Sequence, residues 1–307
     1  MSKIFVTGGA GFIGSHLVDR LLSEGHDVTV IDDFSTGHRE NLEGSKATVY
    51  DWNILTDLTI LYNSFDYVFH LAAVVGVKKV MSNIERTLYV NAQGTRNVLK
   101  TFPSAKILIA STSEMYGNSI AMPLREDDNV LVNTTLSPRW GYACSKLMCE
   151  YEGLACYRQY GTKVVIARIF NTVGPRQVGD YGMVFPRFVQ CALNNETINI
   201  YGDGTQTRSF CHVKDTVDGL CKLMFTDGTE GQVFNVGNNK EIEIRRLAQF
   251  IKGRLHSKSE IKLKHSDVAE IFRRQPSLKK IWEFTGYVPE YSVEQMINDV
   301  VEYHRNV

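Results

Sequence analysis

The chain has 307 residues, of which 43% are hydrophobic and 22% charged, as in an ordinary globular protein. Its 34 basic and 34 acidic residues balance, so net charge favours neither a nucleic acid nor a membrane as partner. No stretch is long and apolar enough to span a bilayer, and the first strand-like run, at residue 3, leaves no room for a signal peptide. The six cysteines form no C-x-x-C pair, so we expect no metal site and a cytoplasmic protein with reduced thiols.

Short apolar runs alternate with helical patterns through the first part of the chain. The predicted strands cover residues 4–7, 28–32, 47–50, 67–70, 107–110 and 164–169. The predicted helices between them cover residues 12–23, 57–63, 85–101 and 142–160. Strands that alternate with helices indicate parallel β-α-β units. We therefore predict an α/β fold with a Rossmann-type, doubly wound parallel sheet.

The pattern changes after about residue 170. Gly-rich loops come first, and predicted helices follow at residues 184–194, 214–225 and 293–304. We interpret residues 171–307 as a smaller C-terminal α/β lobe that binds substrate, fused to a dinucleotide-binding domain of residues 1–170. The two parts are expected to interleave, with some strands of the second returning to the first.

A glycine loop follows the first predicted strand directly. Gly8, Gly11 and Gly14 lie in the sequence Thr-Gly-Gly-Ala-Gly-Phe-Ile-Gly, which opens the first predicted helix. Glycines let the backbone turn sharply and approach a pyrophosphate, and the free N–H groups at the helix start hold the phosphates. The second strand ends in Asp32, whose carboxylate can bind both ribose hydroxyls but repels a 2′-phosphate. This pattern predicts a dinucleotide site that prefers NAD to NADP.

Tyr142 and Lys146 are four residues apart in a predicted helix, so both project from one face. A free tyrosine has a pKa of about 10. A neighbouring ammonium and an oxidised nicotinamide would both lower it. Tyr142 is then a candidate base that takes a proton from a sugar hydroxyl while hydride leaves the same carbon. Alone, this spacing is common by chance, but here it follows a glycine loop and a strand that ends in Ser-Thr-Ser.

Together these motifs resemble the extended short-chain dehydrogenase/reductases, a family of nucleotide-sugar epimerases, dehydratases and decarboxylases. Further matches extend the resemblance over nearly the whole chain. They are His70-Leu-Ala-Ala73, Ser111-Thr-Ser-Glu-Met-Tyr-Gly117, Ile169-Phe-Asn-Thr-Val-Gly-Pro-Arg176, Ile200-Tyr-Gly-Asp-Gly-Thr-Gln-Thr-Arg-Ser-Phe210 and Arg273-Arg-Gln-Pro276.

The resemblance implies that NAD is the cofactor and that particular residues bind it. The glycine loop would hold the pyrophosphate, Asp32 the adenosine ribose, and Asp51 would lie near the adenine. The expected cofactor residues are Gly8, Gly11, Phe12, Ile13, Gly14, Asp32, Asp33, Asp51, Trp52, Leu71, Ala72, Ala73, Asn91, Ser111, Tyr142 and Lys146.

The resemblance also implies a UDP-sugar substrate and a homodimer. Arginines suit the substrate because forked guanidinium groups match the two charges of a diphosphate. In similar proteins the helices at residues 85–101 and 142–160 pair across a dimer as a four-helix bundle. The expected substrate residues are Asn171, Arg176, Arg187, Tyr201, Arg208 and Arg274.

The reaction is expected to begin with oxidation of the sugar at C4. The expected catalytic residues are Thr112, Ser113, Glu114, Tyr142 and Lys146. A 4-ketone acidifies the C5 proton and turns a C5 carboxylate into a β-keto acid, so Glu114 indicates work at C5 or C6. Ser113 is a poor acid at a position where the 4,6-dehydratases carry Asp. Thr-Ser-Glu therefore resembles the UDP-glucuronate decarboxylases, which form UDP-xylose.

Other reactions stay open at this point. His70-Leu-Ala-Ala-Val-Val-Gly76 is more typical of 4-epimerases, which act on UDP-glucose or UDP-glucuronate, and some dehydratases carry the same Ser-Glu pair. Glu114 could also pack locally without touching substrate. A catalytically silent NAD(H)-binding regulator is another alternative, although it would have no physical reason to keep Thr112, Tyr142 and Lys146 together.

Overall fold

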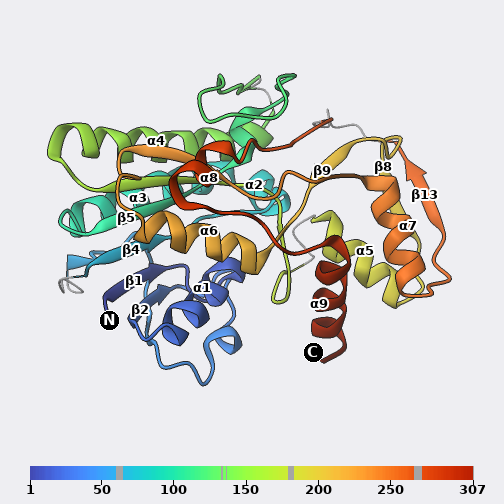
Figure 1. The fold of residues 1–307 in the computed structure, drawn as a ribbon, viewed down its shortest axis with the longest axis horizontal. Helices are drawn as coiled ribbons and strands as arrows, with labels where there is room; N and C mark the ends of the chain where they lie inside the picture. Colours follow the sequence, from blue (N-terminus) through green and yellow to red (C-terminus); the bar gives the residue numbers. More distant parts are fainter. Residues whose placement is uncertain (60–64, 133, 136, 179–182, 266–271, 307) are drawn as a thin grey trace.

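The structure, a computed structural model, describes residues 1–306 except 60–64, 133, 136, 179–182 and 266–271. Within these residues, seven parallel strands form one sheet in the order β11-β6-β5-β4-β1-β2-β3. Figure 1 labels β1, β2, β4 and β5 of this sheet. The strands are β1 (Lys3–Thr7), β2 (Asp27–Asp32), β3 (Thr48–Asp51), β4 (Tyr67–His70), β5 (Lys106–Thr112), β6 (Val164–Ile169) and β11 (Gln232–Val236). The order runs outward from β1 in both directions, which is the doubly wound arrangement. The predicted fold class is confirmed.

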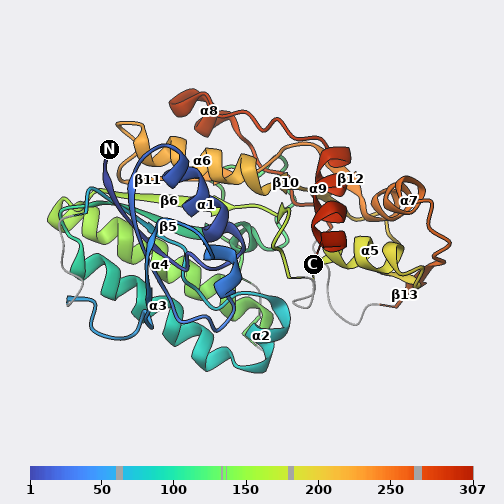
Figure 2. The ribbon, with the colours of Figure 1, turned by 90° about the horizontal axis from the view of Figure 1, so that it is seen from below.

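Helices cover both faces of this sheet (Figure 2). One face carries α1 (Phe12–Ser23) and α6 (Val213–Phe225), and the other carries α3 (Ile84–Thr101) and α4 (Arg139–Tyr160). Along β1, Ile4 and Val6 pack into one core while Phe5 packs into the other, because successive strand side chains point to opposite faces. Burial on both faces explains why inner strands such as β1 and β5 are mostly apolar instead of alternating.

Most predicted elements of the first half match the observed ones within a few residues. The helix predicted from residue 142 begins at Arg139, because Pro138 already has a helical φ of −58° and can stand at a helix start. The helix predicted at residues 57–63 falls largely outside the described residues. The strand β11 was not predicted, although it pairs in parallel with β6 along its whole length.

A smaller lobe lies beside the sheet, with its own apolar core. Its elements are β7 (Thr172–Val173), α5 (Val184–Leu193), β8 (Ile198–Tyr201), β9 (Thr207–Ser209), β10 (Cys211–His212), β12 (Glu241–Glu243), α7 (Ile244–Arg254), β13 (Ile261–Lys264) and α9 (Val293–Asn306). Phe185, Leu247 and Ile297 are fully buried in this core. The chain also returns to the sheet after residue 171, since α6, β11 and α8 (Lys279–Thr285) pack there.

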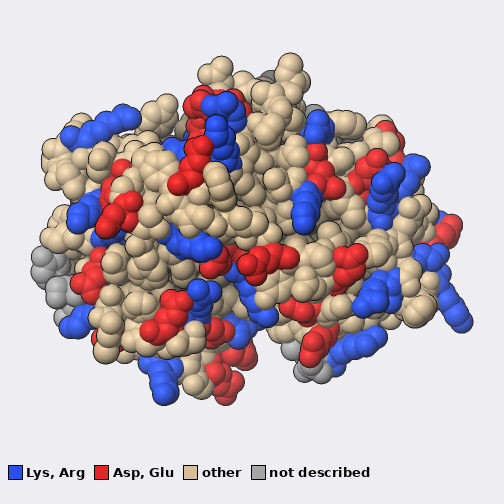
Figure 3. Space-filling view, viewed as in Figure 1, with Lys and Arg blue, Asp and Glu red and all other residues tan. Residues whose placement is uncertain are grey.

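The carboxyl ends of the parallel strands meet at the edge that faces the smaller lobe. Ligands of doubly wound sheets bind at this edge, outside the ends of the strands. Basic and acidic side chains are interspersed over the face of the molecule seen in Figure 3, as the balanced composition implies. Among the described residues, no helix combines the length and the apolarity needed to cross a membrane.

Candidate active site

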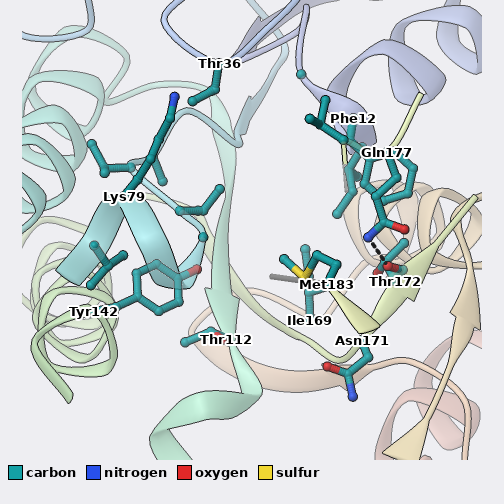
Figure 4. Close-up of a pocket in the computed structure, with 18 of the residues that line it drawn as sticks. Phe12, Thr36, Lys79, Thr112, Tyr142, Ile169, Asn171, Thr172, Gln177 and Met183 are labelled. Atoms are coloured by element: carbon teal, nitrogen blue, oxygen red, sulfur yellow. Dashed lines mark hydrogen bonds between the residues drawn. The ribbon is translucent and has the colours of Figure 1, made fainter. Parts of the chain in front are cut away.

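A cavity of about 770 Å³ lies at this edge, between the sheet and the smaller lobe. Its size is that of a typical ligand site. All of the residues expected to bind cofactor or substrate or to act in catalysis line it, with the exception of Asp51 and Asn91. Figure 4 shows Tyr142 on one side, with its hydroxyl directed inward, and Phe12 and Gln177 on the other. The fold therefore gathers residues from positions 8 to 274 around one space.

The glycine loop packs too closely to admit side chains. A Cβ on Gly8, whose φ is +74°, would lie 2.7 Å from the backbone nitrogen of Ala72. A Cβ on Gly14 would lie 2.1 Å from the carbonyl oxygen of Gly8. Gly11 is the N-cap of α1 and offers no side-chain cap, and the first turn of the helix has no acidic residue. Its first N–H groups are available to an anion, so the loop fits the pyrophosphate of a dinucleotide.

Two carboxylates stand at the end of β2. Asp32 is buried, and its oxygens accept hydrogen bonds from the backbone N–H groups of Ala10 and Phe34, each at 2.9 Å. Burial raises the pKa of Asp32, and these two N–H groups act in the opposite direction. The neighbouring Asp33 accepts a hydrogen bond from Asn53 at 2.8 Å. The acids are thus held in place beside the glycine loop, where they fit the hydroxyls of an unphosphorylated ribose.

Asp51 and Asn91 lie outside the cavity lining. Asp51 ends the edge strand β3, where its exposed carboxylate forms an ion pair with Arg39. Asn91 is buried behind the lining, where its Oδ1 accepts a hydrogen bond from the N–H of Val74 at 2.8 Å and its Nδ2 donates to the Ser145 hydroxyl at 2.9 Å. Asn91 therefore ties the loop after β4 to α4, so it supports the cavity wall without lining it.

Thr112, Tyr142 and Lys146 come together where β5 ends and α4 begins. Burial raises the pKa of Tyr142, as does the nearby Glu114 carboxylate, while a hydrogen bond with Thr112 acts in the opposite direction. Burial lowers the pKa of Lys146, whose Nζ donates to the carbonyl of Ala110 at 2.9 Å. Lys146 is thus bound to the end of β5. The expected lowering of the tyrosine pKa is not found for the protein alone, because burial outweighs the hydrogen bond.

Glu114 lies beyond Thr112 in a short 3₁₀ helix, η3 (Ser113–Tyr116). The Thr112 hydroxyl accepts a hydrogen bond from the N–H of Glu114 at 3.2 Å, which fixes the start of this turn. The guanidinium Nη1 of Arg274 lies 3.6 Å from the Glu114 carboxylate. Arg274 is only 6% exposed, so this ion pair is largely protected from water. Arg274 was expected where the nucleotide diphosphate and the sugar bind, and the structure places it beside Glu114.

The substrate residues expected in the second lobe line the other end of the cavity. The Arg187 guanidinium lies 5.4 Å from the ring centre of Tyr201 and donates to the carbonyl of Asn199 at 3.2 Å. Arg208 donates to the carbonyl of Thr207 at 2.7 Å. Arg187 thus lies beside an aromatic ring, and Arg208 adds a second cation to the same cavity lining, which suits a nucleoside diphosphate.

Asn171 and Arg176 lie where the chain leaves the sheet. The Nδ2 of Asn171 is buried and has no hydrogen-bond partner among the described residues. A buried amide without a partner indicates a group that a ligand satisfies. Arg176, at a φ of +66°, is held by an ion pair with Asp19 at 2.8 Å. Its charge is therefore shared with α1 and is less available to a diphosphate than the sequence suggested.

Some lining residues carried no recognisable sequence signal. Lys79, from the short helix α2 (Val77–Ser82), donates to the carbonyl of Ser35 at 2.9 Å across the dinucleotide end. The Nε2 of Gln177 donates to the carbonyl of Thr172 at 2.9 Å (Figure 4). Both residues lie in loops or short elements. Of the two, Gln177 directly follows a motif recognised in the sequence, Gly-Pro-Arg.

A glycine loop, an acid at the end of β2 and a Tyr-Lys pair on α4 define a dinucleotide-dependent enzyme of the Rossmann class. The chain belongs to the NAD dependent epimerase/dehydratase family, whose model matches residues 4–237.

Several relatives match over nearly the whole chain. The UDP-N-acetyl-alpha-D-glucosaminuronate decarboxylase of Bacillus cytotoxicus is 37% identical over 99% of this chain and 98% of its own. UDP-glucuronic acid decarboxylase 1 of Danio rerio is 36% identical over 98% of this chain and 72% of its own. The crystal structure of the UDP-glucuronic acid 4-epimerase of Bacillus cereus, in complex with UDP-glucuronic acid and NAD, has a TM-score of 0.88 at 28% identity and covers 99% of both chains. The chain is therefore an NAD-dependent enzyme that modifies nucleotide sugars, and the predicted family and cofactor are confirmed.

Proposed function

We propose that the protein decarboxylates UDP-glucuronate and forms UDP-xylose and CO₂. The observation that carries this proposal is the Glu114–Arg274 ion pair, at 3.6 Å, beside the Thr112–Tyr142 pair. A 4-epimerase needs groups only at C4, whereas a carboxylate and a guanidinium beyond Thr112 provide for chemistry at C5. The decarboxylases among the relatives support the same choice.

In this proposal Thr112 and Tyr142 bind the C4 hydroxyl, and Tyr142 takes its proton. When bound, NAD accepts the C4 hydride and later returns it, and its positive ring stabilises the tyrosine phenolate. The 4-ketone makes the substrate a β-keto acid, so the C5–C6 bond breaks, CO₂ leaves, and the electron pair moves onto the C4 oxygen. A proton then adds at C5. Tyr142 finally returns its proton to the C4 oxygen.

We assign the other charged residues by their places along the cavity. Arg274 binds the carboxylate of the sugar until that group leaves as CO₂. Glu114 holds Arg274 in place and takes part in proton transfer at C5. Arg187 and Arg208 bind the diphosphate, with Tyr201 beside them, and Asn171 donates its free amide to the substrate. A uronate attached to a diphosphate carries negative charge on its sugar and on its phosphates, which matches the arginines among the cavity lining.

The products of a substrate panel test the reaction. The purified protein is incubated with UDP-glucuronate, UDP-N-acetylglucosaminuronate, UDP-glucose and UDP-N-acetylglucosamine, and the products are weighed by mass spectrometry. We expect loss of CO₂ from UDP-glucuronate. If UDP-N-acetylglucosaminuronate loses CO₂ and UDP-glucuronate does not, the N-acetylated sugar is the substrate. Loss of water, or isomerisation without a change of mass, would contradict decarboxylation.

Asp32 is expected to make the protein discriminate against NADP. A 2′-phosphate placed beside this buried carboxylate would meet like charge and lose the hydrogen bonds of the ribose hydroxyl. We expect NADP to bind about a hundredfold more weakly than NAD, since each 1.4 kcal/mol costs about a factor of ten. Titration calorimetry with cofactor-depleted protein measures both affinities. Equal affinities for the two cofactors would contradict the assignment of Asp32.

We infer that two copies of the chain pair through α3 and α4. Both helices expose large apolar side chains to solvent: Tyr89 is 59% exposed on α3, and Met148 and Tyr151 are 43% and 67% exposed on α4. Apolar side chains gathered on a helix pair favour a partner of the same kind, as in a four-helix bundle. Light scattering should give the mass of a dimer for the native protein and of a monomer for Tyr89→Glu/Tyr151→Glu. A monomeric native protein at micromolar concentration would contradict this pairing.

We also propose a reducing compartment, the cytoplasm, as the place of action. All six cysteines are free thiols, and three of them are buried in the protein core. Free buried thiols are typical of proteins that function in a reducing environment.

A further inference from the structure

A buried polar network lies behind the active site, on the side of η3 that faces away from the cavity. Arg168 of β6 and Glu150 of α4 form a paired hydrogen bond, Nε to Oε1 and Nη2 to Oε2, each at 2.9 Å. Both residues are no more than 4% exposed. The other nitrogen of Arg168, Nη1, donates to the hydroxyl of Tyr116 at 2.9 Å. A buried charge is tolerated only when it is paired and fully hydrogen-bonded, so this network gives Tyr116 a fixed place.

Asn235 of β11 connects this network to a second segment. Its Oδ1 accepts a hydrogen bond from the Tyr116 hydroxyl at 2.7 Å. Its Nδ2 donates to the carbonyl of Leu124 at 3.0 Å and more distantly to that of Ser277 at 3.4 Å. Leu124 in turn exchanges backbone hydrogen bonds with Gln275 and Ser277, at 2.8 and 2.7 Å. One buried amide thus touches both η3 and the segment at residues 275–277.

These two segments carry the charged pair of the active site. Glu114 stands in η3, two residues before Tyr116, and Arg274 directly precedes Gln275. Asn235 itself is fully buried and does not line the cavity, and both polar atoms of its side chain bind protein groups. Its backbone N–H also donates to Glu126, at 2.8 Å. Asn235 therefore cannot touch a substrate and can act only through the residues that it holds.

We infer that Asn235 is a positioning residue that sets the distance between Glu114 and Arg274, through Tyr116 on one side and Leu124 and Ser277 on the other. This inference rests on the proposed function, in which that pair acts after C4 oxidation. The residues that carry out C4 oxidation are held separately, since Lys146 bonds to Ala110 and Tyr142 to Thr112. Disturbing Asn235 should therefore slow the steps at C5 and leave hydride removal from C4 largely intact.

Two substitutions test the two sets of hydrogen bonds that Asn235 makes, one to Tyr116 and the other to Leu124 and Ser277. Tyr116→Phe removes the hydroxyl that donates to Asn235 and accepts from Arg168, and leaves the ring packed against Phe170. Asn235→Asp keeps an acceptor for Tyr116 but turns a carboxylate oxygen toward the carbonyls of Leu124 and Ser277. Either variant should move one member of the Glu114–Arg274 pair relative to the other.

The experiment compares hydride removal with product formation in each NAD-loaded variant. Reduction of bound NAD in the first turnover is followed by absorbance after mixing with UDP-glucuronate, and CO₂ release is measured in the steady state. A misplacement of about 1 Å costs about a hundredfold in rate, so we expect kcat for CO₂ release to fall between about tenfold and a hundredfold. KM and the rate at which bound NAD is reduced in the first turnover should stay within about twofold of the native values, a change well under 1 kcal/mol. Reduced cofactor should therefore accumulate on both variants.

Tyr287→Phe is the matched control, because Tyr287 is equally buried and its hydroxyl donates to the carbonyl of Gly237 at 2.9 Å, away from both segments. This variant should lose thermal stability without accumulating reduced cofactor. If Tyr116→Phe and Asn235→Asp slow both steps equally, or if the control accumulates reduced cofactor too, the positioning role is wrong. If the native protein releases no CO₂, the proposed reaction fails, and the same two steps are compared on the sugar of the panel that is converted. If the variants keep the native ratio of hydride removal to product formation on that sugar, the inference is also overturned.

Discussion

Tyr142→Phe should abolish turnover of nucleotide sugars while the protein keeps its bound NAD. The substitution removes only the phenol hydroxyl, which is directed into the cavity beside Thr112. Without it, the C4 hydroxyl has no acceptor for its proton as hydride leaves. Acid–base groups in such positions contribute about 10²- to 10⁴-fold to the rate, and we expect a loss at the upper end of this range. Activity is measured by product mass, and NAD content by release on denaturation.

The control for this prediction is Tyr160→Phe at the end of the same helix. Tyr160 is 77% exposed at the last position of α4, so loss of its hydroxyl should leave both activity and NAD content unchanged. Substantial turnover in Tyr142→Phe would show that another group takes the proton. Loss of NAD together with activity would instead assign the hydroxyl to cofactor binding.

Glu114→Gln should separate C4 oxidation from decarboxylation. The glutamine keeps the shape of the side chain but removes its charge, so Arg274 loses the anion that lies 3.6 Å from it. The guanidinium is nearly buried, where charge pairing matters far more than at the surface. We expect reduced cofactor to appear on addition of UDP-glucuronate, with CO₂ release lowered by about 10²- to 10³-fold, as for loss of a charged group beside reacting atoms.

A surface ion pair of the same length provides the control. Lys279 and Glu283 of α8 are also 3.6 Å apart, but both are well exposed, and such pairs contribute little. Glu283→Gln should therefore leave every rate unchanged. Full CO₂ release by Glu114→Gln would make Glu114 a structural carboxylate, which was the alternative left open by its sequence motif. Absence of any reduced cofactor would place Glu114 in the oxidation step instead.

The cofactor half of the site was predictable because its features are local. Gly8, Gly11 and Gly14 are close in sequence, and their role depends on one strand, one turn and one helix start. Asp32 ends the next strand, at a position set by the apolar pattern. Asp51 ends the edge strand β3, where its side chain is exposed and paired with Arg39, so its place near the adenine stays a prediction.

The substrate half depended on contacts between distant segments. The motif around Arg274 suggested a substrate residue but not its neighbour, because the segment that carries it pairs with Leu124, about 150 residues earlier in the chain. The returning strand β11 carried no distinctive pattern, yet it brings Asn235 between these segments. Asn91 was expected at the cofactor by resemblance, but its burial behind the cavity wall could not be foreseen from sequence spacing.

By itself, the amino-acid sequence determined the alternation of strands and helices, the glycine loop, the acid after the second strand and the spacing of Tyr142 and Lys146. These features follow from backbone geometry and side-chain periodicity within a few tens of residues. Only the tertiary structure decided which charges meet and how burial alters them. The pairing of Arg274 with Glu114 joins segments more than a hundred residues apart, and the raised pKa of Tyr142 arises mainly from burial, so neither leaves a local pattern.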